Sequence, residues 1–150
     1  MGIDKIKRRL AADEGFTLIE LLIVIVILGI LVAIAVPSYL SFRGKAETAA
    51  SQANVRSAIP AAESYYQDNT GVATDVDANA GTTKYQGMTG ALLRTEAPGV
   101  STSVKAGPNA AGDGYCVQAV QGGSTYYYTG GNGGSASITS GACPAGYTVA

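Results

Sequence analysis

The chain opens with a charged stretch and continues into one long run of apolar side chains. Residues 16–36 hold sixteen Leu, Ile, Val or Phe residues and a single charge, Glu20. At helical rise these 21 residues extend about 31 Å, close to the roughly 30 Å of a bilayer hydrocarbon core. The pattern predicts a membrane-spanning helix. Four basic side chains precede it, namely Lys5, Lys7, Arg8 and Arg9. The positive-inside rule therefore places the amino terminus in the cytoplasm and residues from 38 onward outside.

A short motif joins the charged leader to the apolar run: Gly15-Phe16-Thr17-Leu18-Ile19-Glu20. Leader, motif and apolar run, ending at Pro37, together resemble the precursor of a type IV pilin, a prepilin with a class III signal peptide. The resemblance implies that a membrane peptidase and N-methyltransferase cuts between Gly15 and Phe16 and methylates the new amino terminus. It also implies that the retained helix polymerises into a filament and that Glu20 is required for assembly.

Glu20 is the one charged side chain among the aliphatic residues. A carboxylate in hydrocarbon is costly unless it is neutralised or paired, so its presence there suggests a function. The amine of Phe16, freed by cleavage, is the obvious cationic partner. Pairing within one helix is possible at a spacing of four residues, whereas the resemblance implies pairing with the amine of a neighbouring subunit. A Glu tolerated near the lipid headgroups is the simpler alternative.

Gly29 and Pro37 are the helix-weakening residues of the apolar run. Pro37 lacks the N–H that would bond the carbonyl of Ala33, so a bend is expected there. The resemblance implies that the stretch between Gly29 and Pro37 can lose helicity within the filament. Close helix packing at Gly29 is an alternative that the sequence leaves open.

An ordinary secretory signal is the main competing interpretation, because Ala33-Ile34-Ala35 resembles its cleavage pattern. Such a signal has an apolar core of about 7 to 15 residues without an acid. The run here is longer and contains Glu20, which favours a helix that is retained after cleavage.

Small residues continue the helical pattern beyond Pro37. They recur at spacings of three and four and predict the buried face of the second half of the helix: Ala46, Ala49, Ala50, Ala53, Ser57, Ala61 and Tyr65. One helix over residues 16–68 is expected, stopped by Asn69-Thr70-Gly71. Pro60 should bend this helix a second time or break it.

The remainder predicts a small antiparallel sheet. Four β-rich runs, at residues 100–105, 115–120, 125–129 and 136–139, are separated by Gly, Pro and Asn. A tight hairpin is expected at Gln121-Gly122-Gly123-Ser124, and a short helix at 88–94. The predicted fold is α+β, a pilin-like roll in which a long N-terminal helix packs on this sheet. The expected organisation is a cleaved leader at 1–15, the long helix at 16–68 with its membrane segment at 16–36, and a globular head at 69–150.

Cys116 and Cys143 lie in the C-terminal third without the further Cys or His residues that a zinc site needs. A disulfide between them is expected, since a translocated domain meets an oxidising compartment. Two free buried thiols are the alternative. The disulfide would hold the glycine-rich C-terminal tail on the sheet, and the resemblance implies a similar disulfide-bounded region.

Other chemistry finds little support in the sequence. Asp75-Val76-Asp77-Ala78-Asn79 opens like a calcium loop, but Ala80 and Gln86 stand where such a loop needs Gly and Glu, so a solvated loop is favoured. The mature chain carries six basic and eight acidic side chains, which predicts no direct nucleic-acid binding. The chain has no His and no nucleophile motif, so no enzyme, metal site or cofactor is expected. The tyrosines at 65–66 and 126–128 are expected to be structural.

The favoured function is a structural subunit of a type IV pilus, or fimbrium, with roles in adhesion, twitching motility or DNA uptake. Its expected partners are other copies of itself, the prepilin peptidase, the pilus assembly machinery and the lipid bilayer before assembly. Its expected location is the cytoplasmic membrane first and the extracellular pilus afterwards. Two alternatives remain: a pseudopilin of a type II secretion system, and a membrane-anchored small-ligand binding protein.

Overall fold

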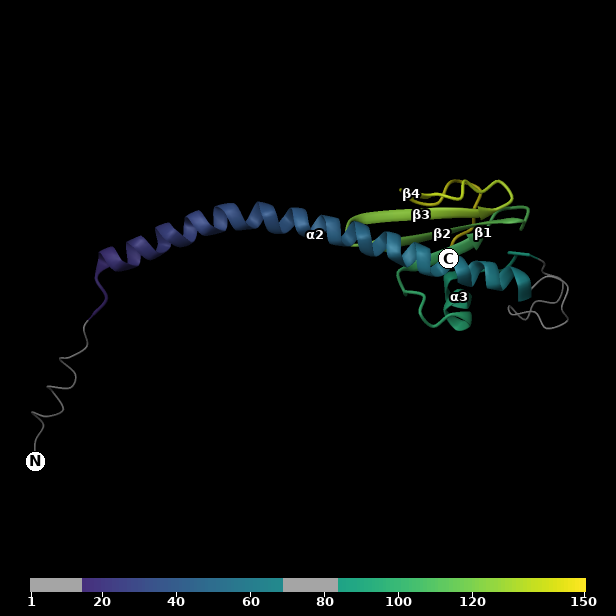
Figure 1. The fold of residues 1–150 in the computed structure, drawn as a ribbon, viewed down its shortest axis with the longest axis horizontal. Coiled ribbons are helices and arrows are strands. Elements are labelled where there is room, and N and C mark those ends of the chain that lie inside the picture. The colour runs from purple at the N-terminus through teal and green to yellow at the C-terminus, as the bar shows by residue number, and fades with distance from the viewer. Residues whose placement is uncertain (1–14, 69–83) are drawn as a thin grey trace, which may run out of the picture. The chain divides into compact units, whose positions relative to one another are not determined.

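The computed structural model describes residues 15–68 and 84–150 (Figure 1). The chain divides into two compact units between Ser41 and Phe42. The predicted helix stop at 69–71 and the candidate calcium loop at 75–79 lie outside the described residues. The elements are helices α2 (Leu18–Asp68) and α3 (Gly90–Glu96) and strands β1 (Val104–Pro108), β2 (Gly114–Gln121), β3 (Ser124–Gly131) and β4 (Ile138–Ser140).

Helix α2 is continuous across both prolines. Of the bend or break expected at Pro60, the break is therefore wrong. Pro60 itself is exposed, so the carbonyl that its ring leaves without an N–H can bond water instead. The neighbouring alanines Ala58, Ala61 and Ala62 are buried in the core of the head, and this packing holds the helix through the proline.

The buried face of α2 differs from the predicted one. The residues that pack inward are Ser51, Val55, Ala58, Ala61, Ala62 and Tyr65. Only Ala61 and Tyr65 were expected among them, whereas Ala46, Ala53 and Ser57 are exposed. An alanine buries little apolar area, so its spacing is a weak guide to the face that turns inward. The larger side chains of Val55 and Tyr65 are both fully buried and mark the true face.

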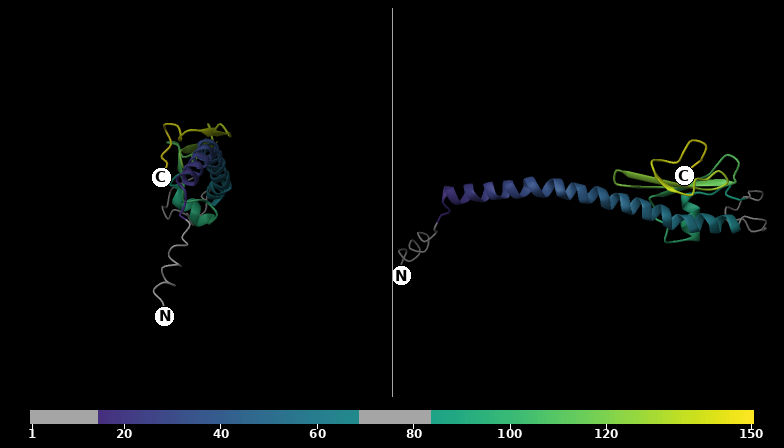
Figure 2. Two further views of the ribbon diagram at one scale, coloured as in Figure 1. Left: turned by 90° about the vertical axis from the view of Figure 1, so that its left-hand side faces the viewer. Right: turned by 45° about the horizontal axis from the view of Figure 1, so that its top comes forward.

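The four strands form one antiparallel sheet in the order β1-β2-β3-β4, as the predicted fold class requires. The hairpin between β2 and β3 is confirmed, with Gln121 opposite Ser124 and a positive φ of 58° at Gly122. Figure 1 shows the sheet lying along the second half of α2, and the turned views of Figure 2 agree. Residues from both pack into one core with Tyr85, Met88 and Leu93.

Strand β1 begins later than predicted. Residues 101–103 form a turn, in which the Ser101 hydroxyl accepts the N–H of Ser103 and the Ser101 carbonyl accepts the N–H of Val104. A local Ser hydrogen bond thus replaces the first part of the expected strand. Strand β1 also bonds the C-terminal segment, since the N–H of Ala150 donates to the Ala106 carbonyl at 3.1 Å.

Helix α3 starts two residues after the predicted position. Thr89 is its N-cap, with a side chain that accepts the N–H of Leu92 at 3.2 Å. Thr89 was not singled out from the sequence, although Thr favours the N-cap over the helix interior and could have marked this start.

Cys116 and Cys143 form a disulfide, with their Cα atoms 6.0 Å apart. Cys116 is fully buried in β2, and the N–H of Cys143 donates to Gln118 Oε1 at 2.8 Å. The tail after β4 is thereby fixed to the middle of the sheet.

Candidate functional site

The start of α2 is a capping box built from Thr17 and Glu20. The Glu20 Oε2 atom accepts the Thr17 N–H at 2.9 Å and the Thr17 hydroxyl at 2.8 Å. In return, the Glu20 N–H donates to Thr17 Oγ1 at 3.3 Å. This reciprocal pair satisfies two backbone donors that the first turn of a helix would otherwise leave unpaired. Thr17 was not singled out from the sequence, although the spacing Thr-x-x-Glu is the signature of such a cap.

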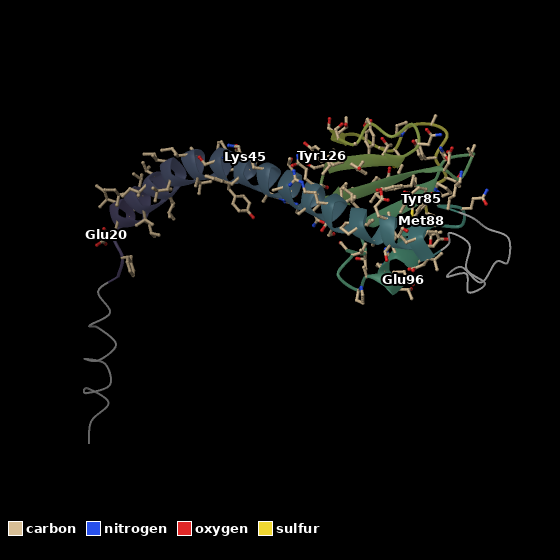
Figure 3. The ribbon with its side chains drawn as sticks, turned by 45° about the vertical axis from the view of Figure 1, so that its right-hand side comes forward. Glu20, Lys45, Tyr85, Met88, Glu96 and Tyr126 are labelled. Atoms are coloured by element: carbon tan, nitrogen blue, oxygen red, sulfur yellow. A yellow bond between two sulfur atoms is a disulfide. The ribbon has the colours of Figure 1, made fainter. Side chains whose placement is uncertain are left out.

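The capping box leaves part of the Glu20 carboxylate available. Both bonds from Thr17 go to Oε2, and no residue in the described part of the chain donates to Oε1. A carboxylate has about four acceptor positions, so Glu20 can cap the helix and still accept a cationic donor. Figure 3 shows Glu20 at the start of α2.

The first half of α2 exposes its apolar side chains all round. Each large apolar residue between Phe16 and Phe42 is at least 48% exposed, and Phe16 reaches 85%. One segment of α2 is long and apolar enough to cross a membrane, with a mean hydropathy of 3.3. A helix that is apolar on every side is stable only when lipid or other protein surrounds it.

Gly29 and Pro37 both lie within regular helix. A Cβ atom built at Gly29 would meet nothing within 4 Å, so packing within a single copy does not require glycine there. Beside Pro37, the Ser38 hydroxyl donates to the Ile34 carbonyl at 3.3 Å. This hydrogen bond, which was not predicted from the sequence, supplies a donor in the turn that the proline weakens.

Within the head, Glu47 joins α2 to the β2–β3 hairpin. It accepts Arg43 Nε at 2.9 Å and the Gly123 N–H at 3.3 Å. The hydrogen bond from Arg43, followed by that from Gly123, lowers the pKa of Glu47. One turn further on, the Ser51 hydroxyl donates to the Ser124 carbonyl at 2.8 Å. These contacts fix the hairpin against α2.

A second carboxylate, Glu63, binds two tyrosines of the core. Its oxygens accept the Tyr115 hydroxyl at 2.7 Å and the Tyr85 hydroxyl at 3.0 Å. Burial, reinforced by the bonds to Glu63, raises the pKa of both tyrosines. The rings of Tyr85 and Tyr115 pack 4.6 Å apart, and Tyr128 lies 6.0 Å beyond Tyr115. Tyr128 was expected to be structural, whereas Glu63 was missed, because nothing in its spacing pointed to tyrosines so far along the chain.

Within the described residues, no group of three or more His, Cys, Asp or Glu side chains is placed to hold a metal ion. Among the described residues, the most distinctive segment is the capped and exposed apolar helix that follows Gly15.

Comparisons with known proteins point to the same N-terminal segment. The family model described as "Prokaryotic N-terminal methylation motif" matches residues 11–36. The chain is 31% identical over 115 residues to the type IV wide pilus major component PilA4 of Thermus thermophilus, an alignment that covers 77% of this chain and 79% of that protein. No solved structure matches the chain.

Other relatives match shorter stretches of the chain. The type IV major pilin protein PilA of Myxococcus xanthus is 38% identical over 56 residues, covering 37% of this chain and 26% of that protein. The type II secretion system core protein G of Pseudomonas aeruginosa is 40% identical over 57 residues, covering 38% of this chain and 40% of that protein. The chain thus spans about a quarter to two fifths of the length of these two relatives.

A capped apolar helix behind a charged leader, carrying a small antiparallel head, defines a prepilin. The long alignment with the Thermus pilus component shows that the chain belongs to the type IV pilin family.

Proposed function

We propose that the chain is the precursor of a structural subunit of a type IV pilus and not an enzyme. The observation that carries this proposal is the capping box on a helix whose apolar surface is exposed on every side. Such a helix needs lipid before assembly and other copies of itself afterwards. The relatives, which are named as pilus components, support the same function.

Processing divides the proposed precursor at the bond between Gly15 and Phe16. Residues 1–15 are the leader, the helix at 16–68 holds the membrane segment at 16–36, and residues 69–150 form the head. A prepilin peptidase removes the leader and methylates the amine of Phe16. The subunit then waits in the cytoplasmic membrane until the assembly machinery adds it to the surface filament.

Assembly depends on Glu20 in this proposal. The free Oε1 atom of Glu20 accepts the Phe16 amine of a neighbouring copy, while Oε2 keeps the bonds to Thr17. An unpaired carboxylate in hydrocarbon is costly, so this pairing favours the filament over the dispersed membrane form. Gly29 and Pro37 let the intervening turns of the helix unwind when subunits are stretched along the filament axis.

The test separates the charge of Glu20 from its capping role. Glu20→Gln keeps an oxygen that can accept the Thr17 N–H but removes the negative charge, whereas Thr17→Val removes the capping hydroxyl and keeps the charge. We expect Glu20→Gln to be inserted and processed normally and to lower the yield of sheared filaments by about tenfold or more. Thr17→Val should keep most of the filaments.

Glu96→Gln, the same change on α3 in the head, is the matched control. Mass spectrometry of the mature amino terminus checks that every variant is cut and methylated at Phe16. Normal filament yield from Glu20→Gln would refute the pairing role, and a mature protein beginning at Val36 would refute the proposed processing.

A pseudopilin of a type II secretion system is the second candidate, favoured by the match to core protein G. That alignment covers 57 residues, whereas the alignment with the Thermus pilus component covers 115 and reaches well into the head. Electron microscopy and a secretion assay on cells with and without the gene decide between them. Loss of long surface fibres supports the pilus, whereas loss of protein secretion with fibres unchanged supports the pseudopilin.

A further inference from the structure

A polar cavity of about 330 Å³ opens in the head at the end where β2 begins and β3 ends. Its lining comes from four segments, namely the end of α2, the turn before α3, the start of β2 and the end of β3: Tyr66, Lys84, Tyr85, Asp113, Gly131 and Asn132. This volume is at the lower end of the range for small-molecule sites. None of these residues takes part in the function proposed above.

Asp113 is held rigidly in this cavity. Its Oδ1 atom accepts Asn109 Nδ2 at 2.9 Å, and its Oδ2 atom accepts Asn132 Nδ2 at 2.9 Å. These two hydrogen bonds, with that from Asn132 the larger effect, lower the pKa of Asp113, so the group is a carboxylate at neutral pH. Each oxygen can accept a further hydrogen bond. The result is a fixed pair of acceptors whose orientation does not depend on a ligand.

The rest of the lining combines an aromatic wall with hydrogen-bond donors. The ring of Tyr66, which is partly exposed, packs 4.8 Å from the buried ring of Tyr85. The ammonium of Lys84, an exposed residue, adds a positive donor near Asp113 and contributes to its lowered pKa. Figure 3 marks Tyr85 within the head. Aromatic carbon, a carboxylate and an ammonium therefore meet around one small volume.

This combination excludes several ligand classes. A metal ion is disfavoured because the cavity offers one carboxylate and places a lysine beside it. A purely apolar ligand would leave Asp113 and Lys84 without water or partners, which is costly. A free anion would be repelled by the Asp113 carboxylate. The lining suits a molecule that has an apolar face and hydroxyl groups able both to donate and to accept.

We propose that this cavity binds a neutral pyranose sugar. The apolar C–H face of the sugar ring contacts Tyr66, two adjacent hydroxyls donate to Asp113, and another hydroxyl accepts from Lys84. A single sugar in so open a polar site should bind with a dissociation constant of about 1 mM. The proposal does not depend on filament formation, because all of the contacting residues belong to one copy of the chain.

The test uses the full chain in micelles of a detergent without a sugar headgroup. The probes are the methyl glycosides of glucose, galactose, mannose and N-acetylglucosamine, each titrated to about 50 mM and followed by saturation-transfer and chemical-shift NMR. We expect at least one of them to bind, and Asp113→Asn and Lys84→Gln each to weaken that binding about tenfold. Glu96→Gln, a charge removal outside the cavity, should leave it unchanged.

Near-ultraviolet circular dichroism checks that each variant keeps the folded head. Two results would overturn the proposal: no binding of any of the four glycosides by the wild-type chain, or equal binding by wild type and the folded Lys84→Gln variant. Neither result would bear on filament assembly, which is measured by the yield of fibres and not by sugar binding.

Discussion

Removing the disulfide should destabilise the head by several kcal/mol. Cys116 and Cys143 are separated by 27 residues in the sequence. In the chain-entropy model, closing a loop of this length restricts the unfolded chain by about 3.5 kcal/mol at 25 °C. The same segment has noncovalent anchors as well: the three residue pairs between β3 and β4, the hydrogen bonds from the Gly141 N–H to Thr125 and from the Cys143 N–H to Gln118, and the bonds from the N–H groups of Thr148 and Ala150 to β1.

The variant of choice is Cys143→Ala, because position 143 is not part of the buried core. Cys116→Ala would also empty a fully buried site in β2 and add a cavity cost on the order of 1 kcal/mol. We therefore expect the free energy of unfolding to fall by about 3 to 4 kcal/mol for Cys143→Ala and somewhat further for the double variant.

The assay is unfolding of the full chain by guanidinium in micelles, followed through the tyrosine fluorescence of the head. Wild type measured in reductant should match Cys143→Ala, which separates the loss of the cross-link from the change of side chain. A loss smaller than about 1 kcal/mol in both experiments would refute the reasoning, since the tail would then be held by its noncovalent contacts or the unfolded chain would already be compact.

Two further predictions concern the head. Because the pKa of Tyr115 is raised in the folded chain, this hydroxyl ionises at lower pH in the unfolded chain. Its contribution to the free energy of unfolding is therefore complete below about pH 10 and is lost as the pH rises further. Tyr115→Phe should make the free energy of unfolding fall less steeply above pH 10 in alkaline denaturation series, and an unchanged slope would contradict this. Gly122→Ala should cost about 1 kcal/mol, because Gly122 has a positive φ and an added Cβ would meet the Glu47 carboxylate. Gly123→Ala, where a Cβ meets nothing within 4 Å, is the control in the same turn; equal midpoints of thermal unfolding for the two variants would exclude the strain argument.

The features of this protein that depend on local pattern were predictable from the sequence. The apolar helix, the β2–β3 hairpin and the α+β class follow from hydropathy, turn residues and β-propensity, and the structure has all three. The Cys116–Cys143 pairing was also expected, since the chain contains two cysteines.

Other features depend on contacts between distant segments. The inward face of α2 is set by the position of the sheet, which alanine spacing does not encode, so Val55 was missed as a core residue. Glu63 could not be assigned to Tyr85 and Tyr115 because they are 22 and 52 residues away. Strand β1 was placed too early since the local hydrogen bond of Ser101 competes with strand pairing.

The position of the capping box has a consequence for how the precursor would change when its leader is removed. The hydrogen bonds of the capping box join Thr17 and Glu20, which both lie on the carboxyl side of the proposed cut. Cleavage after Gly15 would therefore leave the capping box unaltered and turn the amide nitrogen of Phe16, one residue before Thr17, into an ammonium. The proteolytic signal for polymerisation would then be a change of charge at the start of a helix that is already capped.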